Sequence, residues 1–298
     1  MKIKPWIEAA RLRTLPLSMS GIVVGSFVAY KQGHWDGTIF LLAMLTTLFL
    51  QTLSNYANDL GDSYKGADNE GRIGPVRTIQ SGKVTQKQMI VGTSIMAILS
   101  FATAVPLILL GTSEMPTSVL WTYILLALLS ILAAITYTVG KKAYGYHGMG
   151  DVMVFVFFGL VSVLGSYTLY SKVFDGSLIL FAICIGFLSI AVLNLNNMRD
   201  HENDEKVGKR TLVVIMGFER AKVYHSFLIV AAFICVLFFL IHQGWWVSLI
   251  SLFPFIILFN HLVKVWKTKE PKALDAEMKK VALSTFGIAV LFLISTFL

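Results

Sequence analysis

Asparagine and aspartate residues gather in two short clusters, each at the end of a long apolar segment. The first cluster consists of Asn55, Asn58, Asp59 and Asp62, and the second of Asn196, Asp200 and Asp204. Spacings of i, i+3, i+4, i+7 and of i, i+4, i+8 place each cluster on one face of a helix. Carboxylates projecting from two membrane helices into a shared polar cavity suit a divalent cation that holds a phosphate-bearing substrate.

A carboxylate at a helix C-terminus meets the negative end of the helix dipole, so these positions need a compensating cation. Mg²⁺ would compensate them while also binding phosphate oxygens. The candidate metal ligands are Asp59, Asp62, Asp200 and Asp204, with Asp68 as a further candidate. The alternative is a set of solvated helix ends or partners for nearby Lys and Arg. Two clusters of the same helical phase on one membrane face favour the metal site.

The segments that carry the clusters are those of a membrane protein. Hydrophobic residues make up 56% of the 298 residues and charged residues only 14%, and the mean hydropathy is +0.71. Nine apolar stretches are each long enough to cross a hydrocarbon layer of ~30 Å. They are 15–30, 37–58, 88–112, 115–138, 152–171, 177–198, 223–243, 245–263 and 281–298. The sequence therefore predicts an all-α integral membrane protein of about nine transmembrane helices, organised as one domain over 1–298.

Basic residues are distributed very unevenly between the two sides of this predicted bundle. Of the 25 Lys and Arg residues, all but Lys31 and Lys172 fall in the N-terminal segment or in alternate loops. Because basic loops stay in the cytoplasm, the N-terminus and both aspartate clusters are predicted to be cytoplasmic and the C-terminus to lie on the opposite side. The net charge of +8 belongs to this pattern, and nucleic-acid binding is not expected. No obligate protein partner is evident, and the expected surroundings are a lipid bilayer.

The polar loops after the clusters supply candidate groups for a phosphate-bearing substrate. Arg72 and Arg77 could clamp a diphosphate through paired donors, and the second loop offers Arg199, Lys209 and Arg210. A third polar loop could place Tyr137 and Lys141 beside the same cavity. The candidate residues for orienting carboxylates or metal-bound water are Asn55, Asn58, Asn196 and Asn197.

Together these motifs resemble those of the UbiA superfamily of intramembrane aromatic prenyltransferases. Asn58-Asp59-x-x-Asp62, with Asp68 downstream, is similar to the first aspartate-rich motif of that family, and Asp200-x-x-x-Asp204 to the second. The resemblance covers essentially the whole chain. It implies nine transmembrane helices around a central cavity, and Mg²⁺ bound by the aspartates with a polyprenyl diphosphate.

Finer similarity points to the branch of the family that acts on 1,4-dihydroxy-2-naphthoate in menaquinone biosynthesis. The segments that carry it are 65–75, 145–151 and 196–212. This similarity implies transfer of a polyprenyl group to the naphthoate, with release of CO₂ and diphosphate to give demethylmenaquinol, at a bacterial inner membrane. The sequence departs from the branch at Lys141-Lys142, and Asp68 is set further downstream than in shorter-spaced members, where it could orient the loop without touching metal.

Three alternatives remain open from the sequence. The acceptor could be another aromatic acid, such as 4-hydroxybenzoate. A transporter would also place polar clusters between membrane helices, although the acidic residues here gather at one surface. A phosphatidyl-type transferase also uses Mg²⁺, but its single contiguous motif is absent from this sequence.

Overall fold

A computed structural model describes residues 3–298, and every regular element in this part of the chain is helical. In chain order these elements are α1 (Lys4–Ala10), η1 (Leu12–Thr14), α2 (Leu15–Lys31), α3 (Gly37–Lys65), α4 (Gln86–Gly111), α5 (Thr117–Thr136), η2 (Tyr144–Tyr146), α6 (Gly150–Val154), η3 (Phe155–Gly165), α7 (Ser166–Ser171), η4 (Gly176–Leu178), α8 (Ile179–Lys206), α9 (Leu212–Met216), α10 (Phe218–His242), η5 (Val247–Leu252), α11 (Pro254–Lys267), η6 (Pro271–Ala273) and α12 (Leu274–Ser295).

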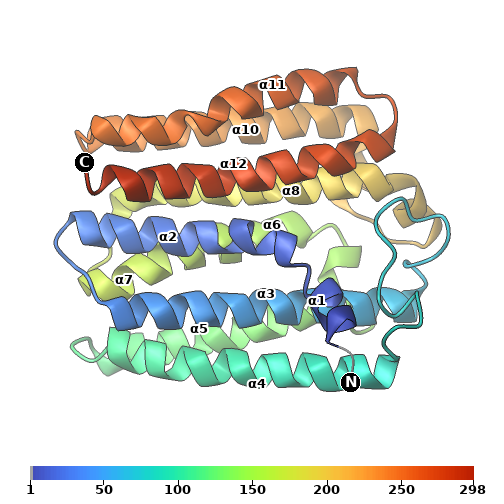
Figure 1. Cartoon of the computed structure of the whole chain (residues 1–298), viewed down its shortest axis with the longest axis horizontal. Coiled ribbons are helices and arrows are strands. Elements are labelled where there is room, and N and C mark those ends of the chain that lie inside the picture. Colours follow the sequence, from blue (N-terminus) through green and yellow to red (C-terminus); the bar gives the residue numbers. More distant parts are fainter. Residues whose placement is uncertain (1–2) are drawn as a thin grey trace.

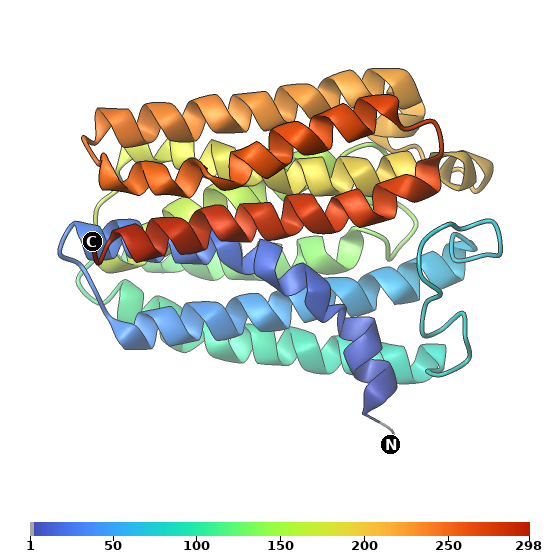
Figure 2. The ribbon, with the colours of Figure 1, turned by 45° about the horizontal axis from the view of Figure 1, so that its top comes forward.

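Nine helical segments within the described residues are long and apolar enough to cross a membrane, which confirms the predicted number. They lie side by side in one bundle (Figure 1). The short helix α1 and the long connection between α3 and α4 lie at one end of the bundle, and the C-terminus lies at the other (Figures 1 and 2). We call the end with the α3–α4 connection the aspartate end, because both clusters lie there.

Two predicted helix ends were placed too early. The apolar stretch 37–58 continues as helix α3 to Lys65, and 177–198 continues as α8 to Lys206. Both clusters therefore lie inside helices. The extension is possible because polar partners from the loops cover these last turns, and α3 ends only at Gly66, whose φ of 69° suits a glycine. At 29 residues, α3 is about 43 Å long, which exceeds the ~30 Å of hydrocarbon.

The start of the predicted last span, 281–298, was placed too late, again because polar residues belong to the helix. The helical segment begins at Pro271, and α12 begins at Leu274. Its first turns carry Asp275 and Glu277, so a search for apolar residues passes over them. Of these two, Glu277 is buried.

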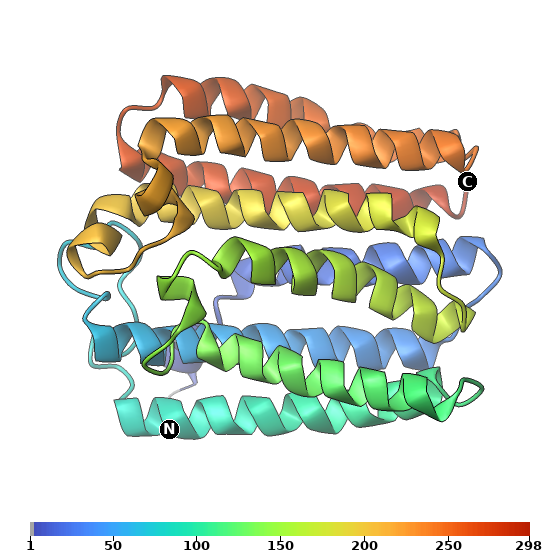
Figure 3. The ribbon, with the colours of Figure 1, turned by 180° about the vertical axis from the view of Figure 1, so that it is seen from behind.

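Helix α8 lies at the centre of the bundle and is packed on nearly every side. Phe181, Ile185 and Leu188 are fully buried in its apolar half. It crosses η3, an 11-residue π-helical segment, through a pair of glycines. A Cβ atom on Gly159 would come within 2.8 Å of the Ala182 carbonyl oxygen and 2.9 Å of the Gly186 Cα. The two backbones can approach this closely only without side chains. Figure 3 shows the crossing region from behind.

The last three helices, α10 to α12, are joined by a buried polar chain. The Nε2 atoms of His225 and His261 lie 2.8 Å apart, and His261 Nδ1 lies 2.7 Å from a carboxylate oxygen of Glu277. The two histidines look scattered in the sequence, because the helices that bring them together are far apart along the chain. Glu277 also pairs with Lys280, so the carboxylate is neutralised where it is buried.

Candidate active site

The carboxylate of Asp59 is the most enclosed of the first cluster, with 1% of the residue exposed. Its Oδ1 atom forms an ion pair with Arg11 and lies 3.7 Å from the Nε atom of Arg77. Its Oδ2 atom accepts a hydrogen bond of 3.2 Å from the Thr78 hydroxyl. Both oxygens are therefore occupied by protein partners. Two of these partners, Arg77 and Thr78, come from the α3–α4 connection, which folds back over the helix that precedes it.

Asn55 holds the N-terminal segment against α3. Its side-chain amide donates hydrogen bonds to the Ala10 carbonyl at 2.8 Å and to the Thr14 hydroxyl at 3.3 Å. One turn later, the side-chain oxygen of Asn58 accepts a hydrogen bond of 3.3 Å from Thr138. Asn55 thus fixes the backbone beside Arg11, and Asn58 ties α3 to the segment that directly follows the fourth span.

Asp62 faces the third polar loop. The hydroxyl of Tyr146 donates to its Oδ1 atom at 2.8 Å. The Lys65 ammonium lies 3.9 Å from the centre of the Tyr146 ring and the Lys209 ammonium 5.6 Å from it, so two cations flank the ring. Burial, reinforced by the Asp62 carboxylate, raises the pKa of Tyr146 well above its usual value. The phenol therefore stays protonated and keeps its donor role.

Asp68 lies in the α3–α4 connection and links the two clusters. The Nε atoms of Arg72 and Arg77 are 3.4 and 3.8 Å from its Oδ1 atom, yet neither of its buried oxygens accepts a hydrogen bond from the described residues. Burial and the nearby Asp62 raise the pKa of Asp68 to about 6. Arg72 also lies 3.8 Å from Asp200, so the loop of the first cluster reaches the second.

The second cluster is built around a fully buried arginine. Arg199 donates hydrogen bonds to both oxygens of Asp200 at 2.9 and 2.5 Å, to Asn196 at 3.0 Å and to Asp275 at 2.6 Å. Asn196 therefore orients this arginine. With so many protein partners, Arg199 is suited to fixing Asp200 in place and is less suited to the substrate contact that the sequence predicted.

Asp204, one turn further along α8, is partly unpaired. The ammonium of Lys209 lies 3.4 Å from its Oδ1 atom, whereas the buried Oδ2 atom has no hydrogen-bond partner among the described residues. Burial opposes the charge of Lys209, but the carboxylates of Asp204 and Asp62 outweigh it and raise the pKa of the lysine. Lys209 therefore carries a firm positive charge beside both clusters.

The remaining residues that were predicted to bind substrate differ in how deeply they are buried. Asn197 is buried, with its side-chain oxygen unpaired among the described residues. Tyr137 lines an internal cavity. Lys141 and Arg210 are exposed, and Arg210 contributes a backbone hydrogen bond of 3.1 Å to the Tyr146 carbonyl. Substrate binding by the Lys141 and Arg210 side chains stays a prediction.

The donor set fits Mg²⁺ in chemistry, although the carboxylates do not form a closed cage. Within residues 3–298, no three Asp, Glu, His or Cys side chains gather closely enough to hold one metal ion together. Mg²⁺ does not need such a cage, because it usually binds one or two carboxylates together with water and phosphate oxygens. The free buried oxygens of Asp68 and Asp204 are the hard ligands that such an ion takes.

A cavity of about 340 Å³ opens beside the clusters and extends along the inside of the bundle. On α3 its wall includes Asn58 at the aspartate end and Ala43 deep in the bundle, a separation of about 22 Å along the helix. The wall is formed by α2 to α7 and by Leu193 of α8, and α10 to α12 contribute no described residue to it. The cavity thus lies within the first six spans.

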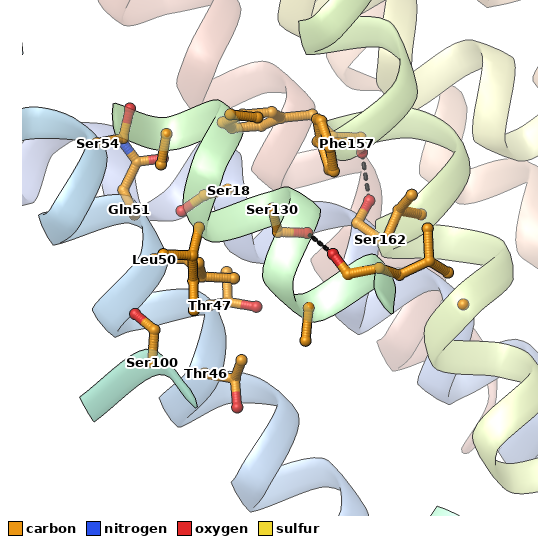
Figure 4. Close-up of a pocket in the computed structure, with 18 of the residues that line it drawn as sticks. Ser18, Thr46, Thr47, Leu50, Gln51, Ser54, Ser100, Ser130, Phe157 and Ser162 are labelled. Carbon is orange, nitrogen blue, oxygen red and sulfur yellow. Dashed lines mark hydrogen bonds between the residues drawn. The ribbon is translucent and has the colours of Figure 1, made fainter. Parts of the chain in front are cut away.

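The cavity wall is less polar than its residue types suggest. Figure 4 shows a series of hydroxyl groups along it. Ser130, Ser100 and Ser18 donate to carbonyl oxygens of their own helices at 2.7 to 2.9 Å, and Thr46 donates to Thr103 at 3.0 Å. Because these hydroxyls are already paired, the wall presents mainly carbon to its interior. It suits a long apolar chain whose polar head lies at the clusters.

Comparison with known proteins identifies the family. The model of the UbiA prenyltransferase family matches residues 18–291. The chain belongs to the UbiA prenyltransferase family. This UbiA protein is 41% identical over 295 residues to a 1,4-dihydroxy-2-naphthoate octaprenyltransferase of Haemophilus influenzae, covering 98% of this chain and 95% of the relative. It is 38% identical over 301 residues to the Escherichia coli enzyme of the same name, covering 100% and 96%.

Solved structures share the fold of this UbiA protein. A UbiA homolog from Aeropyrum pernix K1 aligns with a TM-score of 0.71 at 14% identity over 99% of this chain and 98% of that one. A UbiA homolog from Archaeoglobus fulgidus, bound to GPP and Mg²⁺, aligns with a TM-score of 0.68 at 16% identity over 97% and 98%. The predicted family and the all-helical membrane fold are both confirmed.

Several residues at this site were not predicted as site residues from the sequence. Arg11 looked like part of the charged lead-in to the first span, yet its side chain reaches Asp59. Thr78 and Tyr146 each donate a hydrogen bond to an aspartate. A usable signal existed for Tyr146, which lies in a segment that resembles the naphthoate branch. For Arg11 there was none, because its position depends on a turn of the backbone.

Proposed function

We propose that this UbiA family member transfers a polyprenyl group from polyprenyl diphosphate to 1,4-dihydroxy-2-naphthoate, with release of diphosphate and CO₂. The observation that carries the proposal is the position of the apolar cavity. Asn58 belongs to its wall and immediately precedes the buried Asp59. A prenyl diphosphate has the same division between a charged head and an apolar chain. The names of relatives at 38–41% identity supply the acceptor.

The candidate metal ligands are Asp59, Asp62, Asp68, Asp200 and Asp204, of which one or two would bind a given Mg²⁺ ion together with water and diphosphate oxygens. When bound, Mg²⁺ would neutralise the diphosphate oxygens and so favour departure of the leaving group. Arg72, Arg77 and Lys209 would bind the same diphosphate through charge-assisted hydrogen bonds, which strengthen as negative charge develops on it. These cations already lie within 3.4 to 3.8 Å of the aspartates, so they need little rearrangement to reach an anion held there.

The cavity would receive the prenyl chain and keep water from the reacting carbon. Several of its hydroxyls are already paired within the protein, and most of the other lining side chains are aliphatic or aromatic. Exclusion of water matters because an allylic carbon that loses diphosphate would otherwise react with it. The electron-rich naphthoate ring would instead attack that carbon. Tyr137, which lines the cavity, would contact the acceptor ring.

The chain would act in a bacterial inner membrane with the aspartate end toward the cytoplasm. Nine candidate spans and bacterial relatives support the membrane. The orientation rests on the basic residues, which are concentrated in the N-terminal segment and in the loops at the aspartate end. The aromatic acceptor and the diphosphate head group would then both reach the site at its cytoplasmic end.

In the decisive experiment, purified protein is incubated with Mg²⁺, a polyprenyl diphosphate and either 1,4-dihydroxy-2-naphthoate or 4-hydroxybenzoate. Prenylated product and released CO₂ are then measured. We expect product and CO₂ from 1,4-dihydroxy-2-naphthoate alone, and none after chelation of Mg²⁺. Product from 4-hydroxybenzoate alone would keep the reaction type but overturn the acceptor. No product from either acceptor with folded protein would overturn the prenyltransferase proposal and favour transport, which uptake into sealed vesicles would then test.

A further inference from the structure

Arg11 occupies a strained corner of the N-terminal segment. Its φ of 49° and ψ of 55° lie in the left-handed region between α1 and η1, and the only other non-glycine residue with positive φ in the described chain is Lys172. This conformation is uncommon for a residue other than glycine, and here it ends helix α1, with the Arg11 N–H donating to the Glu8 carbonyl. Here the Asn55 amide holds the adjacent Ala10 carbonyl at 2.8 Å. The corner aims the Arg11 side chain at Asp59.

Helix α1 is docked firmly, so the corner cannot drift away from the site. The Tyr56 hydroxyl donates to the Trp6 carbonyl at 3.1 Å, and the two rings meet edge to face at 5.4 Å. The Trp6 ring also packs over Gly92 of α4, where a Cβ atom would come within 2.4 Å of it. The backbone beside Arg11 is therefore fixed, while its long side chain can still change partners.

The guanidinium groups near Asp59 have donors to spare. The Nε–H groups of both Arg11 and Arg77 are buried without a hydrogen-bond acceptor among residues 3–298. The Arg77 Nε atom lies 3.7 Å from Asp59 and 3.8 Å from Asp68, beyond hydrogen-bonding distance of either carboxylate. Buried unpaired donors of this kind call for an acceptor, and a diphosphate supplies several.

Each oxygen of Asp59 already has a protein partner. Its Oδ1 atom is held by Arg11 and its Oδ2 atom accepts from Thr78. A metal ion bound at Oδ1 would lie close to the Arg11 guanidinium, and repulsion between the two cations would favour movement of the guanidinium away from the carboxylate. Asp68 and Asp204 differ in this respect, since each has an oxygen with no partner among the described residues.

We propose that Arg11 exchanges between two partners: it neutralises Asp59 in the ligand-free protein and moves to the diphosphate when the metal–diphosphate pair binds. This inference rests on the proposed function for the identity of the ligand. It makes Arg11 both a competitor of the metal for Asp59 and a binding residue for the substrate head group. Loading of metal and diphosphate would then be coupled, because the anion gives the displaced guanidinium a new partner.

The test measures thermal unfolding of the chelator-treated protein in detergent as Mg²⁺ and inorganic pyrophosphate are added. For Arg11→Gln we expect the half-saturating Mg²⁺ concentration to fall, and the half-saturating pyrophosphate concentration at saturating Mg²⁺ to rise, each on the order of tenfold. Arg13→Gln is the matched control. Arg13 is exposed and its replacement removes the same charge two residues away, so both concentrations should stay at the wild-type values.

Each outcome decides the inference. Opposite shifts in the two concentrations support it, whereas an unchanged Mg²⁺ concentration, or a parallel weakening of both, overturns it. If Mg²⁺ alone does not shift the unfolding temperature of the wild type, it must shift that of Arg11→Gln, and the absence of such a shift would overturn the inference. If Arg11→Gln does not fold, Arg11→Lys replaces it in the test. Arg11→Lys keeps the charge and should give half-saturating concentrations between those expected for Arg11→Gln and those of the wild type. Prenylation by the wild-type enzyme tests the proposed function separately.

Discussion

The hydroxyl of Tyr146 donates a hydrogen bond of 2.8 Å to the Oδ1 atom of Asp62. This contact joins the loop after the fourth span to the aspartate cluster on α3. Because the Tyr146 ring also lies beside Lys65 and Lys209, one side chain orients a proposed metal ligand and spaces two cations. A tyrosine that acts in this way should be replaceable for folding but not for metal binding.

Tyr146→Phe tests this orienting role. The ring and its contacts with the lysines remain, while Asp62 loses its donor. We expect the half-saturating Mg²⁺ concentration in the prenylation assay to rise by about 10- to 100-fold, the usual cost of losing a group that orients a metal ligand. The unfolding temperature should stay near that of the wild type. Tyr64→Phe is the control, since Tyr64 is 56% exposed. Equal Mg²⁺ dependence in the two variants would contradict the role.

Asp59→Asn and Asp200→Asn test the use of both clusters. Each variant keeps the side-chain shape but removes a charge that the bound metal and its cationic neighbours require. We expect turnover to fall at least on the order of 10²-fold in each, while both proteins still insert in the membrane. Glu202→Gln removes an exposed charge from the same helix as Asp200 and should leave turnover unchanged. Normal activity in either aspartate variant would disprove the two-cluster site.

Ala104→Phe tests the path of the prenyl chain. Ala104 is buried in the cavity wall, about 27 Å along α4 from its first residue. A larger side chain there should slow transfer from long polyprenyl diphosphates several-fold or more and leave geranyl diphosphate nearly unaffected. Leu109→Phe, at a position 53% exposed, should change neither rate. Equal loss with short and long donors would place the chain elsewhere.

Gly159→Ala tests the close crossing of η3 and α8. The new methyl group would meet two backbone atoms within 3 Å, and backbone cannot turn aside as a side chain can. We expect a loss of about 1–3 kcal/mol in stability, seen as a lower unfolding temperature. Gly165→Ala, in the same π-helical segment, would place its Cβ atom no closer than 3.8 Å to a neighbouring side chain and should be tolerated. Equal unfolding temperatures would show that the crossing can open at little cost.

Asp68→Asn tests the raised pKa of that carboxyl group in the metal-free protein. A pKa of about 6 in the folded state against 3.8 unfolded means that Asp68 favours folding below pH 4 and that this contribution is lost as the pH rises through 6. Relative to wild type, the variant should therefore gain stability between pH 4 and 7, by up to about 3 kcal/mol. Glu70→Gln, exposed in the same loop, should show no such trend. A difference independent of pH would contradict the raised pKa.

The sequence predicted those parts of the site that depend on local spacing. Asp59, Asp62, Asp200 and Asp204 are brought to one end of the bundle because helical periodicity and apolar length can be read along the chain. The partners of these residues depend on tertiary folding. Arg11 reaches Asp59 across 48 positions through a left-handed corner, and no local pattern encodes that contact.

The roles of the charged loop residues stay predictions, and they are harder to infer from the sequence for a related reason. A sequence shows that Arg199 and Lys141 are cations near the site, but it does not show how many partners each finds. Arg199 is enclosed by Asp200, Asn196 and Asp275, while Lys141 is exposed. Burial and partner number separate a scaffold arginine from a substrate ligand, and both follow from how the loops pack.

The length of α3 has a consequence for how the enzyme would acquire its substrate. A helix of 29 residues extends beyond the hydrocarbon layer, so its aspartates lie at the water boundary while its apolar part lines a cavity at lipid depth. A prenyl diphosphate in the bilayer has its diphosphate in water and its isoprenoid chain in lipid. It would enter the protein by lateral diffusion within the membrane, with the diphosphate remaining in water and the chain in an apolar medium. The free energy of transferring a diphosphate into oil, or a long isoprenoid into water, never has to be overcome.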